Sequence, residues 1–451
     1  MNASQAGQGA ADSSPTSPST SSPDSQQAAR DLDQLLRRGI RARYRKERRF
    51  RRFGAVSIAV GVLFLLWLLA VSAFQASSAF HQTYIALDIH LDAAQFGDSR
   101  SHEAIAGARY GKIIKATLRA EFADADTRKA KKELYKLVSD GAQYALRDAV
   151  LRDPSWIGER RRIWVLAGGQ VDLLTKGHIK REQPAATRRL SDRALGWIDQ
   201  LHADGRIEKR FNRPLFTAGD SRNAEEAGIL GAMVGSLLTM LATMLLALPV
   251  GIAAAVYLQE FAPKSKLVDL VEVNINNLAA VPSIIFGLLG LAVLINFFGF
   301  ARSAPLVGGM VLALMTLPTI IISSRAALAS VPPRIRQAAL GVGASGVQCV
   351  IHHVLPLAMP GMLTGAIIGL ARALGETAPL LAIGMVAFIV DVPGGMNDPA
   401  TVLPVQIYLW ADSPERGFVE RTAAAIIVLL VVLVAINGLV ALLRNKLEKR
   451  W

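Results

Sequence analysis

A stretch of 21 residues without charge, 54–74, constrains the fold of this chain more than any other feature. A helix rises about 1.5 Å per residue, so this length spans the hydrocarbon core of a bilayer. A strongly basic segment, residues 30–52, precedes it directly, as in the cytoplasmic flanks of membrane helices. The order predicts an uncleaved membrane anchor rather than a nucleic-acid-binding patch. A cleaved signal peptide is the competing interpretation, but the stretch begins too far into the chain and is too long for one.

Five more apolar runs lie in the second half of the chain. They occupy residues 227–258, 278–300, 304–324, 361–390 and 422–443. Together with the first stretch they predict six spans, so both termini lie on the same side of the membrane. Basic residues flank the first and the last span, which places that side in the cytoplasm. The expected fold class is therefore an all-α polytopic membrane protein with six transmembrane helices in total.

The segment between the first two spans, residues 75–226, is long enough to form a domain of its own. Residues 83–92 alternate between apolar and polar side chains, which predicts a half-buried strand. A second strand is expected at residues 163–166. Helical spacing of apolar residues predicts helices at 103–121, 127–151 and 191–202. We expect an inserted α+β domain in the periplasm, and the sequence contains no recognisable site within it.

The predicted organisation has four parts. Residues 1–53 form a disordered basic cytoplasmic tail, because residues 1–29 are rich in Ser, Pro and Gln and carry too little apolar surface to fold. The first transmembrane helix at 54–74 and the periplasmic domain at 75–226 follow. The transmembrane core occupies residues 227–451.

Several kinds of chemistry are excluded. The single cysteine, Cys349, rules out a disulfide framework and cysteine-based metal sites, and the histidines lack the spacing of metal ligands. Residues 341–346 match the dinucleotide-binding glycine pattern, but no strand is expected before them. The sequence has no P-loop, so the chain cannot hydrolyse ATP alone. We expect no metal, no cofactor and no enzymatic activity.

Residues 332–360 form a cytoplasmic segment between the fourth and fifth spans. Paired prolines at 332 and 333 allow a helix to begin, and the glycines at 341 and 343 break it, so two short helices at the membrane surface are expected. Small residues on one side of such a pair would suit a groove on a partner protein. An ordinary loop is the alternative interpretation.

This segment resembles the EAA loop of bacterial ABC-transporter permeases, the coupling element that docks onto the ATP-binding subunits. The matching residues are Gln337, Ala338, Ala339, Gly343, Leu355 and Pro356. Two positions depart from the family pattern. Gln337 stands where the family usually has Glu, and His353 stands where it usually has an aliphatic residue.

Residues 369–381, which include Arg372, Glu376 and Thr377, resemble the signature of the PstA-type permease family of phosphate ABC importers. The resemblance extends over residues 227–445 and implies a MetI-like permease core. It also implies import of inorganic phosphate across the bacterial inner membrane. The implied partners are two copies of a separate ATP-binding subunit, a second permease resembling PstC and a periplasmic phosphate-binding protein.

Arg372 and Glu376 stand four residues apart, on one face of the fifth predicted helix and near the bilayer centre. Charges are tolerated there only if they face a bundle interior or a pathway and have a partner. A guanidinium matches phosphate oxygens, and Glu376 would neutralise it between passages. The alternative is that the pair only locks helices together. Ser283 and Thr377 are candidate hydroxyl donors to the anion, although such side chains also bond helix carbonyls.

Two further hypotheses for function stay open. The permease would serve another oxyanion, such as sulfate or molybdate, or the chain would be a membrane sensor or scaffold acting through its periplasmic domain. A scaffold has no need of a charged pair in the middle of the membrane, so the sequence favours transport.

Overall fold

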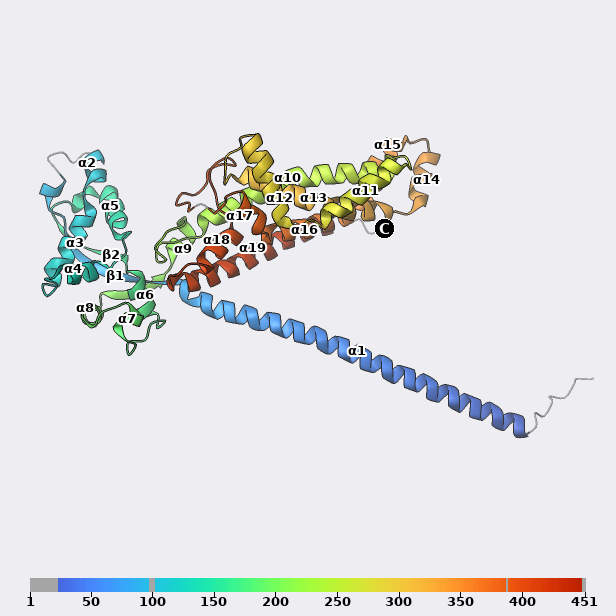
Figure 1. Ribbon diagram of the computed structural model, residues 1–451, viewed down its shortest axis with the longest axis horizontal. Helices are drawn as coiled ribbons and strands as arrows, with labels where there is room; N and C mark the ends of the chain where they lie inside the picture. Colours follow the sequence, from blue (N-terminus) through green and yellow to red (C-terminus); the bar gives the residue numbers. More distant parts are fainter. Residues whose placement is uncertain (1–22, 97–101, 387, 448–451) are drawn as a thin grey trace, which may run out of the picture. The chain divides into compact units, whose positions relative to one another are not determined.

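The computed structural model describes residues 23–96, 102–386 and 388–447, and it divides into two units, residues 1–70 and 71–451 (Figure 1). The described part of the first unit is a single helix, α1 (Pro23–Ala79), whose last residues belong to the second unit. A stretch of this helix, Lys46–Ala79, is long and apolar enough to cross a membrane.

The disordered tail predicted for residues 1–53 is wrong over its second part. Residues 23–53 are helical and continue directly into the predicted first span. Arg, Lys, Leu and Gln are strong helix formers, and no proline follows Pro23 within this stretch, so the charged residues extend the helix. Residues 1–22 lie outside the described residues.

The second unit begins with an α+β domain built on a three-stranded sheet. The strands are β1 (His81–His90), β2 (Arg160–Leu166) and β3 (Ile207–Phe211), in the spatial order β2-β1-β3 with both pairs antiparallel. The strand predicted at 83–92 is confirmed as β1, which begins and ends two residues earlier. The strand predicted at 163–166 is confirmed as the second part of β2. Strand β3 was not predicted, because its short charged stretch lacks the apolar alternation of a half-buried strand.

Eight α-helices belong to this domain and to the segment that leads from it to α10, in the described residues. They are α2 (His102–Gly107), α3 (Tyr110–Glu121), α4 (Arg128–Tyr135), α5 (Ala142–Arg152), α6 (Gly169–Thr175), α7 (Ala185–Arg188), α8 (Asp192–Ala203) and α9 (Arg213–Thr217). The helix expected at 127–151 is two helices, because Val138 between them pairs with Ala167 as an isolated bridge. The predicted helix at 191–202 is confirmed as α8, and Ser191 caps it by accepting a hydrogen bond from the Ala194 amide at 3.2 Å.

The apolar helices of the membrane core follow. They are α10 (Leu230–Val256) with its π-helical extension η3 (Tyr257–Phe261), α11 (Lys266–Ala279), α12 (Ser283–Leu289), η4 (Gly290–Phe297), α13 (Pro305–Ala329), α14 (Pro333–Gly341), α15 (Gly346–Cys349), η5 (Val350–Val354), α16 (Leu355–Gly375), α17 (Ala378–Ala382), α18 (Leu403–Ala411) and α19 (Gly417–Leu447). Five helices in the described residues are long and apolar enough to cross a membrane, or six if a bent pair counts as one span.

Two predicted spans are placed wrongly. The span expected at 278–300 is the second limb of a bent pair, Lys266–Ala279 and Ser283–Phe297, which meet at 103°. Pro282 causes the break, because a proline disfavours helical backbone at the residue before it. The span expected at 361–390 instead runs from Gly346–Gly375, and the short helix α17 begins beyond it at Ala378 with Pro379 in its first turn.

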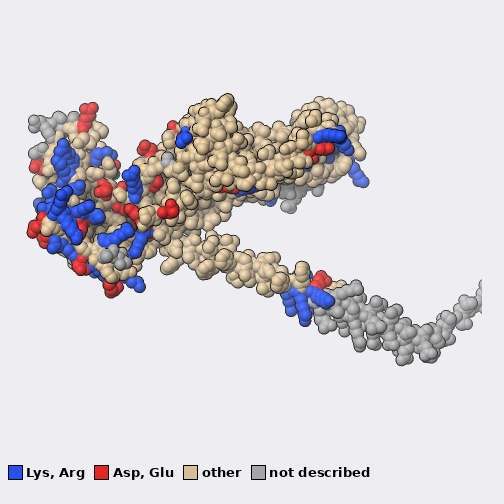
Figure 2. Space-filling model, viewed as in Figure 1, with Lys and Arg blue, Asp and Glu red and all other residues tan. Residues whose placement is uncertain are grey.

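The core helices pack closely through glycines. The missing Cβ of Gly309 on α13 would meet Ala242 on α10, and that of Gly361 on α16 would lie 2.7 Å from the Ala327 Cβ on α13. Gly365 faces Ser323 in the same way. The glycines of α16 therefore permit close contact with α13. Charged side chains gather on the α+β domain, whereas the visible surface of the core helices carries few (Figure 2).

Candidate functional site

The predicted pathway pair, Arg372 and Glu376, lies at the C-terminal end of α16. Arg372 Nε and Glu376 Oε1 are 3.6 Å apart, which is longer than a good hydrogen bond. The Arg372 side chain is 43% exposed and that of Glu376 is 19% exposed. The pair is therefore loose, and most of the guanidinium donors stay available to another acceptor.

The helical arrangement expected for this pair is only partly correct. Arg372 is in the last turn of α16, and Glu376 follows the helix with extended backbone, φ −79° and ψ 130°. A span at 361–390 would place Arg372 about 11 residues from its start, near the bilayer centre. The span instead begins at Gly346 and ends at Gly375, so Arg372 lies close to its end. The pair consequently lies at a break between two helices rather than within a continuous one.

The two predicted hydroxyl donors lie on neighbouring elements. Thr377 immediately precedes α17, and Ser283 begins α12. Gly287 on α12 packs so closely on Pro379 and Ala382 that a Cβ there would lie 2.6 Å from the Pro379 backbone. In the part of the chain that the structure describes, no hydrogen bond or ion pair joins either hydroxyl to Arg372 or Glu376. The structure thus brings the elements together without linking these side chains.

The predicted coupling loop at 332–360 forms two short helices, α14 and α15, followed by the π-helical turn η5. Gln337, Ala338 and Pro356 are exposed, Leu355 is half-buried, and Ala339 is buried at 6% exposure. Gly343 ends the first helix with φ +89°, a backbone conformation that suits glycine. Four apolar side chains of this loop are more than half exposed: Leu340, Val342, Val347 and Ile351. Exposed apolar side chains are typical of surfaces that contact a partner protein or a membrane.

Arg336, which the sequence did not single out, anchors this loop to the core. Its guanidinium donates to Glu260 at 2.7 and 3.1 Å, and to the carbonyls of Leu328 and Val331 at 2.9 and 2.6 Å. Glu260 lies at the end of the extended α10 helix, 76 residues earlier. No local sequence signal could have paired two charges so far apart along the chain.

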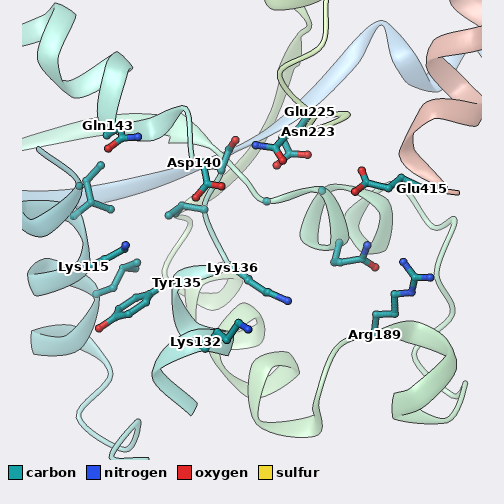
Figure 3. A pocket seen from close by; sticks show the side chains of 18 residues that line it. Lys115, Lys132, Tyr135, Lys136, Asp140, Gln143, Arg189, Asn223, Glu225 and Glu415 are labelled. Carbon is teal, nitrogen blue, oxygen red and sulfur yellow. The ribbon is translucent and has the colours of Figure 1, made fainter. Parts of the chain in front are cut away.

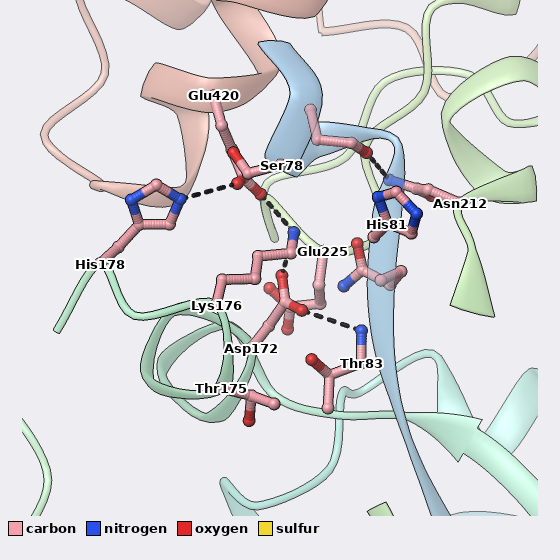
Figure 4. A network of polar contacts seen from close by, with 12 residues as sticks. Ser78, His81, Thr83, Asp172, Thr175, Lys176, His178, Asn212, Glu225 and Glu420 are labelled. Carbon is pink, nitrogen blue, oxygen red and sulfur yellow. Dashed lines mark hydrogen bonds and ion pairs between the residues drawn. The ribbon is translucent and has the colours of Figure 1, made fainter. Parts of the chain in front are cut away.

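A buried ionic network joins the α+β domain to the last core helix (Figure 4). Lys176 of the domain contacts Glu420 of α19 at 2.6 Å and Asp172 of α6 at 2.7 Å, and all three side chains are 3–5% exposed. Asp172 also accepts a hydrogen bond from the Thr83 amide of β1 at 2.9 Å. Figure 4 shows His178 next to Glu420, with its ring nitrogen 3.4 Å from the carboxylate. These contacts fix the domain against the membrane core.

Arg421, the residue after Glu420, is 1% exposed and strengthens the same junction. It donates to the carbonyl of Ala227 at 2.6 Å, to Gln82 Oε1 at 2.7 Å and to the carbonyl of Glu225 at 3.1 Å. The sequence did carry one signal, because Glu420-Arg421 is a charged pair at the start of an otherwise apolar run. Burial raises the pKa of the nearby Glu225 to about 7, and the adjacent Glu226 adds to the shift.

Comparison with known proteins places this architecture in a family. Residues 247–449 match the family described as "Binding-protein-dependent transport system inner membrane component", and residues 37–185 match "Domain of unknown function (DUF3333)". The phosphate transport system permease protein PstA 1 of Mycobacterium tuberculosis is 30% identical over 223 residues, 49% of this chain and 72% of that protein. The phosphate transport system permease protein PstA of Haemophilus influenzae is 33% identical over 204 residues, 44% of this chain and 70% of that protein. The chain belongs to the PstA-type permeases.

As a PstA-type permease, the chain is a multi-pass inner-membrane component of an ABC importer. A non-catalytic transport role follows, with an ATP-binding subunit and a periplasmic binding protein as the partners that the family implies. Among solved structures, the MetNI methionine ABC transporter in an inward-facing form aligns with 49% of this chain and 95% of its own, at 19% identity and a TM-score of 0.38. The PstA-type relatives align with about half of this chain.

Proposed function

We propose that this PstA-type permease conducts inorganic phosphate, and that Arg372 is the residue that receives the anion. The curated relatives that resemble it at 30–33% identity are phosphate transport permeases. The observation that carries the assignment to Arg372 is its loose pairing. An arginine in an apolar helix, 43% exposed and held by one carboxylate at 3.6 Å, has donors to spare for a phosphate.

Glu376 serves as the internal counter-ion in this scheme. Between passages it balances the charge of Arg372, and a phosphate dianion displaces it from the guanidinium. Because the pair is not in close contact, the exchange breaks no short hydrogen bond. Thr377 and Ser283 supply hydroxyl donors along the route, on the two helices that pack together through Gly287.

The exposed surface of the coupling loop docks onto the ATP-binding subunit. Gln337, Ala338 and the apolar patch lie open, whereas Arg336 holds the loop to the end of the extended α10 helix. Movement of the ATP-binding subunit would therefore pass through Arg336 and Glu260 into the membrane helices. Two ATPase copies and a second permease resembling PstC complete the importer, and both termini of the chain lie in the cytoplasm with the α+β domain at 75–226 in the periplasm.

The decisive experiment measures uptake of labelled phosphate in phosphate-starved cells that lack the chromosomal copy and carry either this chain, Arg372→Ala or Arg372→Lys. Equal membrane levels of the three chains are confirmed first. We expect the parent chain to restore uptake that excess sulfate does not reduce, and Arg372→Ala to lose about a hundredfold or more. Arg372→Lys should recover part of that loss, because lysine keeps the positive charge but cannot bind a phosphate through two parallel hydrogen bonds as a guanidinium does.

Failure of a well-inserted parent chain to restore uptake, in its native operon context, would refute phosphate permeation. Normal uptake by Arg372→Ala would refute only the role of Arg372 and would favour a pair that locks helices. Inhibition by sulfate or molybdate would move the assignment to another oxyanion.

A further inference from the structure

A cavity with a volume of about 490 Å³ lies outside the transport core, in the α+β domain (Figure 3). Helices α3 and α4, the turn before α6 and the residue after α7 contribute to it. The loops that precede α10 and α19 close it with Asn223, Glu225 and Glu415. The cavity therefore joins the domain to the membrane core, next to the ionic junction.

One side of the cavity is cationic. Lys115 of α3, Lys132 of α4, Lys136 and Arg189 all line it, and Figure 3 shows Lys132, Lys136 and Arg189 on the same side. None of the four has an ion pair with a carboxylate among the residues that the structure describes, whereas seven other arginines of this domain do. Four cations therefore line the cavity without a direct ion pair.

The opposite side is acidic and amide-rich. Figure 3 shows Asp140, Glu225 and Glu415 across the cavity from the lysines, with Gln143 and Asn223 beside them. Carboxylates accept hydrogen bonds, and amides both donate and accept them. A row of hydroxyl groups, which also donate and accept, matches this side, whereas an ammonium group could only donate.

The backbone is adapted to keep the cavity open. Arg189 has φ +56°, a conformation that costs a non-glycine residue free energy and that persists where the surroundings require it. Gly168 donates to the Leu137 carbonyl at 2.8 Å and approaches the Lys136 carbonyl so closely that a Cβ would not fit. Gly169 leaves room in the same way for the Glu225 carboxylate, which would lie 2.8 Å from its Cβ.

From this arrangement we infer that the cavity is a binding site for a small phosphorylated polyol or sugar. The phosphate group is held by Lys132, Lys136 and Arg189, and the hydroxyl groups bond the carboxylates and amides on the opposite side. The Tyr135 ring, which Lys115 approaches at 5.5 Å, offers an apolar surface for the carbon skeleton. The volume exceeds what inorganic phosphate alone would fill and lies within the range of small-molecule sites.

The test uses the full chain in lipid nanodiscs and isothermal titration calorimetry with three probes: glucose 6-phosphate, glucose and inorganic phosphate. We expect glucose 6-phosphate to bind with a Kd of roughly 1 mM or below. Glucose and inorganic phosphate should each bind at least about tenfold more weakly, because glucose contacts only the acidic side of the cavity and phosphate only the cationic side. No heat with glucose 6-phosphate, or equal affinity for inorganic phosphate, would overturn the inference.

Two variant pairs separate a site from general charge attraction. Lys132→Gln with Lys136→Gln removes cations from the cavity, and we expect binding about a hundredfold weaker, about tenfold for each charged hydrogen bond lost. Lys129→Gln with Lys131→Gln removes the same charge from the same helix but outside the cavity, and should change the affinity by less than about twofold. Equal losses in both pairs would overturn the inference. Arg189→Gln gives a second cavity variant, and melting curves of all three confirm folding.

Discussion

The two charged clusters of this permease are bonded in opposite ways. At the junction, Lys176 contacts Glu420 and Asp172 at 2.6 and 2.7 Å, with side chains 3–5% exposed. In the transport core, Arg372 and Glu376 are 3.6 Å apart, and 43% of the arginine side chain is exposed. Buried pairs in close contact hold parts of a structure together, since breaking them leaves an uncompensated charge. A loose and partly exposed pair contributes little to stability, and exchange of its partner for an anion is what we propose above.

Removal of Lys176 should have the largest effect on stability. Lys176→Met leaves Glu420 and Asp172 buried without their cation, and we expect the free energy of unfolding to fall by about 3–5 kcal/mol. Denaturant unfolding of the purified chain in detergent measures it. Arg162→Met is the matched control, because it breaks the exposed pair with Asp88 (57% and 40% exposed) and should cost at most about 1 kcal/mol. Equal costs for the two variants would remove the distinction between the clusters.

Glu225 should make the junction sensitive to pH. Its pKa of about 7 exceeds the ordinary value of 4.5, so the folded state keeps a proton that the unfolded state releases between these values. Stability therefore falls as pH rises through this window, by up to about 3 kcal/mol above pH 7. Glu225→Gln should flatten the dependence and stabilise the chain at about pH 8.

Unfolding curves of the parent chain and Glu225→Gln at about pH 5 and about pH 8 check this expectation. Two curves that shift with pH by the same amount would show that Glu225 is not the titrating group. The charges of Glu226 and Arg421, which act on the pKa of Glu225, and the cations that line the cavity with it all remain in the variant.

Arg336 should have an intermediate effect. Arg336→Ala frees the coupling loop from Glu260 and from two carbonyl groups, at a cost of about 2 kcal/mol, because the side chain is 23% exposed. We expect faster hydrogen exchange at residues 333–349 and weaker coupling of ATP hydrolysis to uptake. Arg334→Ala, on an exposed residue of the same helix, is the control and should change neither quantity. Unchanged exchange in Arg336→Ala would mean that the loop is held by other contacts.

Glu376 should have the smallest effect on stability. Glu376→Gln removes a partner at 3.6 Å, and we expect a change below about 1 kcal/mol in the free energy of unfolding. Phosphate uptake, by contrast, should slow several-fold, because an unopposed Arg372 releases the anion less readily. A loss of stability as large as that of Lys176→Met would place this pair with the structural contacts.

The sequence was a good guide to features that are periodic or local. Apolar runs without charge predicted the membrane helices, and the helical spacing of apolar residues predicted α8. The predicted spans were wrong near Pro282 and Pro379, where a helix ends inside an apolar run. The apolar content of a run does not show where a proline interrupts the helix. The helix at residues 23–53 was not predicted either, because a basic segment before a membrane span is compatible with both a helix and a disordered tail.

Contacts between distant segments could not be predicted. Lys176 and Glu420 are 244 residues apart, and Arg421 and Gln82 are 339 apart. Each is an ordinary charged or polar residue in its local sequence, and only the fold shows that it is buried. The lysines of the cavity could not be predicted as a cluster either, because they come close to one another only when α3 and α4 pack together.

The α+β domain starts and finishes at one place. Asn212, after the last strand, donates its side-chain amide to the carbonyl of Ala79 at 2.7 Å and its backbone amide to that of Phe80 at 2.8 Å, just before the first strand. A segment whose two ends touch can be gained or lost by a gene without pulling its neighbours apart. The domain is in this sense a separable insertion, which a short linker between residues 79 and 213 could replace, and the buried ionic contact to α19 is what such a replacement would remove from the permease.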